Sequence, residues 1–176
     1  MRLVVLACDV VIDRAHDSAA EEDWAVIPGS PAAVARLNQA YFRVVVVANA
    51  PEADELDGGM PARIHARMMA EIAREGGRVE AVFYCPHERA EECTCRLPRT
   101  GLFDEIRDRL KLDLSGVTFI GRSRDYLAGA RAAGVRVLAV AALPEAEADA
   151  RSLDVLEIYP DLAAAVAALT REQEVS

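Results

Sequence analysis

The sequence lacks any apolar run long enough to span a bilayer, which takes about 20 consecutive residues. Arg2 precedes a short apolar stretch, but that stretch ends in charged sequence at Asp9 and Asp13. It also lacks the small-residue cleavage pattern of a signal peptide. These absences exclude a membrane-spanning protein, and we expect a cytoplasmic one.

The sequence is also short of basic residues. It has 20 Lys and Arg against 29 Asp and Glu, a formal net charge of -9 at pH 7. Nucleic acids and anionic membranes are bound largely through Lys and Arg, so we expect neither as a partner. A phosphorylated ligand would need a locally basic pocket.

Strand-like and helix-like segments alternate along the 176 residues. The first strand, 3–13, is almost wholly apolar, as is typical of a central strand in a parallel sheet. Further strands are predicted at 43–47, 79–84, 117–120, 135–140 and 155–159. Helices are predicted at 30–41, 61–75, 102–110, 123–133 and 162–169, with a short helix or loop at 144–150. We predict one α/β domain, 1–170, with a parallel sheet between two helical layers, and a disordered tail, 171–176.

The segment 85–100 has no apolar periodicity but contains a dense group of metal-ligating residues. Cys85, His87, Cys93 and Cys95 have the spacing C-x-H-x5-C-x-C. Three thiolates and an imidazole form a closed tetrahedral set for zinc, and ligation can order a loop that has no core of its own. We therefore predict a structural zinc ion. The alternative is three buried cysteines and an incidental histidine; His16 and His65 stand alone and are expected at the surface.

The block Tyr84-Cys85-Pro86-His87, the block Cys93-Thr94-Cys95-Arg96 and the following Leu97-Pro98 resemble one family. It is the zinc-containing branch of the haloacid dehalogenase superfamily, which includes the heptose-1,7-bisphosphate and histidinol-phosphate phosphatases. The resemblance implies a Rossmann-like fold without a large cap domain. It also implies hydrolysis of phosphate esters with Mg²⁺ and an aspartyl nucleophile.

The family's catalytic motifs are only partly present. Its D-x-D-G-T motif aligns with Ala7-Cys8-Asp9-Val10-Val11. Asp9 stands at the acid/base position, whereas Ala7 stands at the nucleophile position and has no atom that could form a phosphoenzyme. The Thr or Ser that binds the phosphoryl group is replaced by Ala48, which Asn49 follows.

The two remaining motifs depart further. The family's Lys after the zinc loop is Leu97 here, although Arg96 remains. In the family's G-D-S/K-x-x-D motif, Arg122 and Tyr126 replace the two metal-binding carboxylates. Asp125 is one residue away and would point to another side of a helix. Because Mg²⁺ prefers several oxygen ligands, we do not expect it to bind.

We therefore expect a catalytically inactive relative of these phosphatases, a zinc-stabilised scaffold for a protein partner or an anionic ligand. The alternative is a Mg²⁺-dependent phosphatase of phosphorylated sugars or related molecules that works with an altered site. We expect Arg122 or Arg124 to contact the Asp9 side chain. Cys8 should face away from Asp9, because side chains alternate along a strand. The candidate anion-binding residues are Asn49, Arg96, Arg122, Ser123 and Arg124.

Overall fold

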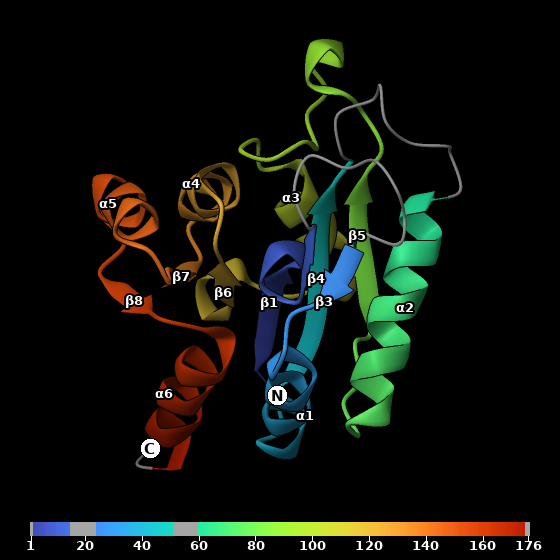
Figure 1. The fold of residues 1–176 in the computed structure, drawn as a ribbon. Coiled ribbons are helices and arrows are strands. Elements are labelled where there is room, and N and C mark those ends of the chain that lie inside the picture. The colour runs from blue at the N-terminus through green and yellow to red at the C-terminus, as the bar shows by residue number, and fades with distance from the viewer. Residues whose placement is uncertain (1, 15–23, 51–59, 175–176) are drawn as a thin grey trace.

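The computed structural model describes residues 2–14, 24–50 and 60–174 and contains a six-stranded parallel sheet. The strand order is β5-β4-β1-β6-β7-β8 (Figure 1). The strands are β1 (Leu3–Ala7), β4 (Arg43–Asn49), β5 (Ala81–Cys85), β6 (Thr118–Gly121), β7 (Arg136–Val140) and β8 (Glu157–Tyr159). β1 pairs with β4 on one side and β6 on the other, so its carboxyl end lies at the middle of the sheet.

Helices cover both faces of this sheet. α1 (Ser30–Gln39), α2 (Met60–Arg74) and α6 (Leu162–Glu174) pack on one face, and α3 (Gly101–Leu110), α4 (Arg124–Ala132) and α5 (Pro144–Ser152) pack on the other (Figure 1). Along β1, Val4 and Leu6 enter the first core, whereas Val5 and Ala7 enter the second. The predicted three-layer α/β architecture is confirmed.

The first strand is shorter than the predicted 3–13. β1 ends at Ala7, and a 3₁₀ turn, Cys8–Val10, carries the chain into a separate antiparallel pair, β2 (Ile12–Arg14) and β3 (Trp24–Val26). Val10, Val11 and Ile12 still belong to the core that also contains Leu6 and Val44, but they reach it from the 3₁₀ turn and the hairpin instead of from a strand of the parallel sheet. Apolar character alone does not show whether a buried residue lies in a strand of the sheet or in a turn.

The terminal helix is longer than the predicted 162–169. Residues 171–174, expected in a disordered tail, continue α6, and Glu172 in this last turn pairs with the Arg136 guanidinium. Asp161 accepts a hydrogen bond from the Ala164 amide at 2.7 Å and so caps the start of this helix, as predicted.

His65 differs from its predicted surface position. It is half-buried in α2, with its ring edge-on to that of Tyr84 at a centroid distance of 5.4 Å. His16 lies outside the described residues. Within the described ranges, every helix is too short or too polar to cross a membrane.

Candidate functional site

The four predicted zinc ligands converge in the loop that follows β5. The Cys85, Cys93 and Cys95 sulfurs and one His87 ring nitrogen all lie within 4.8 Å of one another. The Cys93 sulfur is 3.6 Å from each of the other two sulfurs, and the Cys85 and Cys95 sulfurs are 2.8 Å apart. A tetrahedral zinc with Zn–S bonds of about 2.3 Å has S···S edges of about 3.8 Å. The donor set therefore fits zinc, and the two S···S distances to Cys93 are close to that edge, whereas the distance between Cys85 and Cys95 is about 1 Å shorter.

Cys93 is the thiol of this group most readily ionised. Desolvation raises its pKa, but the Arg96 amide and the Cys85 and Cys95 thiols hydrogen-bond to it and lower the pKa to about 6. The Arg96 amide lies 3.3 Å from the Cys93 sulfur. Because thiolates are the form that binds metals, this environment favours ligation at neutral pH.

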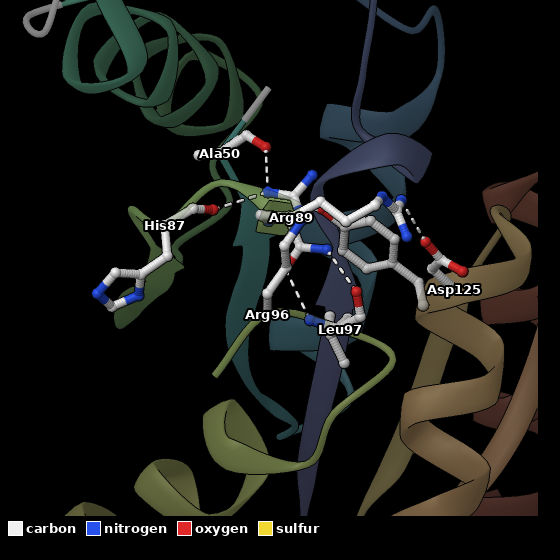
Figure 2. Close-up of polar contacts among 8 residues, drawn as sticks. Ala50, His87, Arg89, Arg96, Leu97 and Asp125 are labelled. Carbon is white, nitrogen blue, oxygen red and sulfur yellow. Dashed lines mark hydrogen bonds and ion pairs between the residues drawn. The ribbon is translucent and has the colours of Figure 1, made fainter. Parts of the chain in front are cut away.

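Arg96 joins the metal loop to the sheet. Its Nη1 donates to the carbonyl of Ala50 at 2.7 Å, just beyond β4, and to the carbonyl of His87 at 2.9 Å (Figure 2). Arg96 is 7% exposed. The predicted anion-binding guanidinium thus binds backbone carbonyls of its own chain, and the order of the metal loop is coupled to the end of β4.

Asp9 lies in the 3₁₀ turn after β1, and the start of α4 surrounds its carboxylate with donors. Oδ1 accepts the Arg122 amide at 3.2 Å, and Oδ2 accepts the Ser123 amide at 2.9 Å and the Ser123 hydroxyl at 2.5 Å. Burial raises the pKa of the Asp9 carboxyl, and the bonds from Ser123 partly offset that rise. Asp9 therefore occupies the helix N-terminus at which Ser123 was predicted to bind an external anion.

The expected side-chain contact between Asp9 and an arginine is wrong. The Arg122 guanidinium reaches Asp13 on β2 instead, with Nη2 at 3.0 Å from Oδ1. Arg124 turns away toward α5, where its Nη1 lies 2.7 Å from the Ser152 hydroxyl and 3.5 Å from Asp149. Arg122 approaches Asp9 through its backbone amide, because the end of β6 lies directly beside β1.

Tyr126 and Asn49 fill the space between the strand ends. The Asn49 amide donates to the Tyr126 hydroxyl at 2.8 Å, and the Asn49 side chain makes two bonds with the backbone of Leu97, at 2.9 and 3.0 Å. The Tyr126 hydroxyl also lies 3.4 Å from the Cys8 sulfur. These contacts tie the 3₁₀ turn after β1, the end of β4, α4 and the segment after the metal loop together. Asn49, predicted to bind an anion, is used for this internal network.

Cys8 does not face away from Asp9 as predicted. The chain has already entered the 3₁₀ turn there, so strand alternation no longer applies, and both side chains line one pocket. Burial raises the pKa of the Cys8 thiol to about 12. The thiol is therefore protonated and a poor nucleophile at neutral pH.

The two positions that the resemblance assigns to the nucleophile and to a lysine are both apolar and fully buried. Ala7 is 0% exposed, and a Cβ at Gly121 would lie 3.2 Å from its methyl group. Leu97 is also 0% exposed, and a Cβ at Gly129 would lie 2.3 Å from its Cδ2. Both side chains belong to the core on the α3–α4 face of the sheet.

The strand ends open into a pocket of about 690 Å³. Besides the predicted residues, three that sequence reasoning missed carry its chemistry: Asp13, Trp24 and Arg89. Arg89 extends from the metal loop to Asp125 on α4, with Nη2 at 2.9 Å from Oδ2 (Figure 2). Arg89 could have been found from the sequence, because it is a basic residue within the loop that contains the metal-ligating side chains. Asp13 gave none, because its hairpin was not predicted.

The carboxylates of this pocket do not converge on a cation site. Asp9 is bonded to the start of α4, Asp13 is paired with Arg122, and Asp125 is paired with Arg89. Within the described ranges, the only group of three or more metal-ligating side chains is the Cys/His set. In the part of the chain that the structure describes, the residues of the loop fit zinc, and each of the three carboxylates of the pocket has another partner.

Comparisons with known proteins give a consistent set of relatives. No family model matches the chain. The D-glycero-beta-D-manno-heptose-1,7-bisphosphate 7-phosphatase of Bordetella bronchiseptica is 35% identical over 160 residues, covering 82% of this chain and 89% of the relative. The enzyme of the same name from Pseudomonas putida is 36% identical over 146 residues, covering 80% and 82%.

Solved structures agree. The crystal structure of the B. bronchiseptica D,D-heptose 1,7-bisphosphate phosphatase complexed with magnesium and phosphate has a TM-score of 0.86 and 31% identity, covering 98% of this chain and 99% of that one. The corresponding phosphatase of Burkholderia thailandensis has a TM-score of 0.70 and 27% identity, covering 96% and 98%. The chain therefore belongs to the heptose-bisphosphate-phosphatase-like family of the haloacid dehalogenase superfamily.

Proposed function

We propose that this member of the family does not hydrolyse phosphate esters, and that its pocket binds an anionic small molecule on a scaffold stabilised by zinc. The single observation that carries the first part is the burial of Ala7. The residue at the nucleophile position is a methyl group in a closed apolar core, without contact with the pocket. Covalent catalysis needs an activated nucleophile at the reacting phosphorus, and this position supplies none.

The electrostatic part of the family's chemistry is also altered among the described residues. Asp9 is bonded to Arg122 and Ser123, and Leu97 places an apolar side chain at the lysine position. A transition state of phosphoryl transfer gathers negative charge, which is stabilised by positioned cations. We infer that the pocket can attract an anion but has no arrangement that stabilises this transition state over the bound ester.

Zinc has a structural part in this proposal. Cys85, His87, Cys93 and Cys95 supply four protein ligands, which leaves no open position for a substrate or water. Binding the ion would order the loop, and through Arg96 also the end of β4.

A second candidate is a phosphatase that works with an altered site, and the relatives favour it. The similar proteins are named as phosphatases, and one crystal structure is described as a complex with magnesium and phosphate. That comparison gives no support to our expectation that Mg²⁺ is not used. In this candidate, Asp9 would be the remaining acid/base group, and an attacking group other than residue 7 would be needed.

Phosphate release separates the two candidates. The zinc-loaded protein is incubated with Mg²⁺ and phenyl phosphate, heptose 1,7-bisphosphate or histidinol phosphate, beside the variants Asp9→Asn and Asp108→Asn. Asp108 is an exposed carboxylate paired with Arg107 and serves as the matched control. We expect no release above the protein-free rate for any of the three proteins. Turnover that Asp9→Asn abolishes and Asp108→Asn leaves unchanged would establish the second candidate.

A further inference from the structure

The contents of the pocket point to a particular kind of anion. Resting on the proposed anion-binding function, we propose that the ligand is a phosphate ester with an aromatic or other apolar body. Its charged group would be held by Arg89 and Arg122, and its body would lie against Trp24 and Ile12. All four residues line the same pocket, whose volume of about 690 Å³ is that of a small-molecule site.

Arg89 and Arg122 each pair with a carboxylate that lines the pocket. Arg89 is paired with Asp125, and their side chains are 63% and 38% exposed. Arg122 is paired with Asp13, and those side chains are 36% and 54% exposed. Ion pairs this exposed are weak, so a ligand oxyanion can replace either carboxylate at little cost. A phosphate offers each guanidinium a bidentate partner, and the displaced carboxylates can turn toward solvent.

The other two arginines of the pocket pair with groups other than its carboxylates. Arg96 is buried and binds the carbonyls of Ala50 and His87. Arg124 is directed toward α5, where it meets Ser152 and Asp149, neither of which lines the pocket. Of the anion-binding set predicted from the sequence, this assignment therefore keeps Arg122 and adds Arg89.

The described amide and hydroxyl side chains of the pocket are already hydrogen-bonded within the chain, which disfavours a ligand rich in hydroxyl groups. Asn49 is bonded to Leu97 and Tyr126, and Ser123 is bonded to Asp9. A polyhydroxylated body would compete with these bonds, and any hydroxyl left without a partner would weaken its binding. An apolar body meets the opposite situation, because the buried Ile12 and the half-buried Trp24 line the pocket and pack with the core beneath the β2–β3 hairpin.

Calorimetric titration of the zinc-loaded protein tests the proposal with three probes: phenyl phosphate, glucose 6-phosphate and inorganic phosphate. We expect phenyl phosphate to bind about 10-fold more tightly than inorganic phosphate, as the burial of one aromatic ring predicts. We expect glucose 6-phosphate to bind no more tightly than inorganic phosphate. Trp24 is the only tryptophan of the chain, so its fluorescence should change during the phenyl phosphate titration.

Variants show which residues bind the phosphate group of the ligand and which contact its apolar body. Arg89→Gln should weaken all phosphate binding, and Asp125→Asn should strengthen it, because the competing carboxylate is removed. Loss of folding would weaken phosphate binding in both variants, so opposite changes in affinity cannot come from it. Trp24→Ala should remove the preference for phenyl phosphate while keeping the affinity for inorganic phosphate. Arg109→Gln is the control, since Arg109 is exposed and paired with Glu105 outside the pocket.

The outcomes distinguish this inference from the proposed function. If inorganic phosphate and phenyl phosphate bind equally well, or if glucose 6-phosphate binds best, the apolar-body assignment is wrong and the anion site stands. If Arg89→Gln leaves phosphate affinity unchanged, the assignment of Arg89 is wrong. If no probe binds, both the inference and the anion-binding function fail.

Discussion

Tyr126→Phe is the most informative single substitution, because it removes one oxygen from the internal network and keeps the ring. Tyr126 is 9% exposed, and its hydroxyl accepts the Asn49 amide at 2.8 Å. Phenylalanine would leave this amide without its acceptor in a partly buried setting, which costs about 1–3 kcal/mol. For a domain of this size, 1 kcal/mol corresponds to roughly 2–4 °C in Tm. We therefore expect the Tm to fall by roughly 2–12 °C.

Thermal unfolding followed by circular dichroism measures the Tm, and urea unfolding measures the free energy of unfolding. Tyr41→Phe is the control. Tyr41 is 80% exposed, so its substitution should change the free energy of unfolding by less than about 0.5 kcal/mol. Zinc content is measured for each variant, because loss of the metal would lower stability by another route. If both variants unfold like the unaltered protein at full zinc content, the network is not stabilising and our account of Tyr126 is refuted.

Three further predictions address the metal loop, the core and pH dependence. The purified chain should contain about one zinc ion, and Cys95→Ser should lower both the zinc content and the Tm, measured by atomic absorption and calorimetry. Leu97→Ala should lower the free energy of unfolding by about 2–5 kcal/mol, because Leu97 is fully buried against Gly129; a loss below about 1 kcal/mol would contradict this packing. A hydrogen bond from Arg43 lowers the pKa of Glu80 below its usual 4.5. The ion pair of Glu80 therefore contributes to stability above pH 4.5, and this contribution is lost as the pH falls through the lowered pKa. Glu80→Gln should lower the free energy of unfolding by less than about 1 kcal/mol at pH 7, and should not lower it below that pKa. Acid titration of both proteins, followed by unfolding, measures the difference.

The metal loop could be predicted from sequence because its information is local. Cys85, His87, Cys93 and Cys95 lie within eleven positions, and donors that close in the chain can meet with few constraints from the rest of the fold. The parallel strands could be predicted for a similar reason, since apolar β-branched runs such as that of β4 suit strands buried on both faces.

The partners of the charged residues could not be predicted, because they depend on contacts distant in the chain. Arg122 was expected to reach Asp9, but the β2–β3 hairpin brings Asp13 within reach of its guanidinium. The end of the first strand was also misplaced: nothing in the apolar run marks the turn at Cys8, which decides that Cys8 and Asp9 line one pocket. Where the chain turns, side-chain alternation ceases to be a guide.

The central claim is that this family member binds phosphate esters without hydrolysing them. The most direct measurement is a phosphate-release assay on the zinc-loaded protein with Mg²⁺ and saturating phenyl phosphate, with binding confirmed by calorimetry in the same buffer. The account predicts bound ester and no phosphate release above the protein-free rate. Release that requires Asp9 and is lost in Asp9→Asn would contradict it.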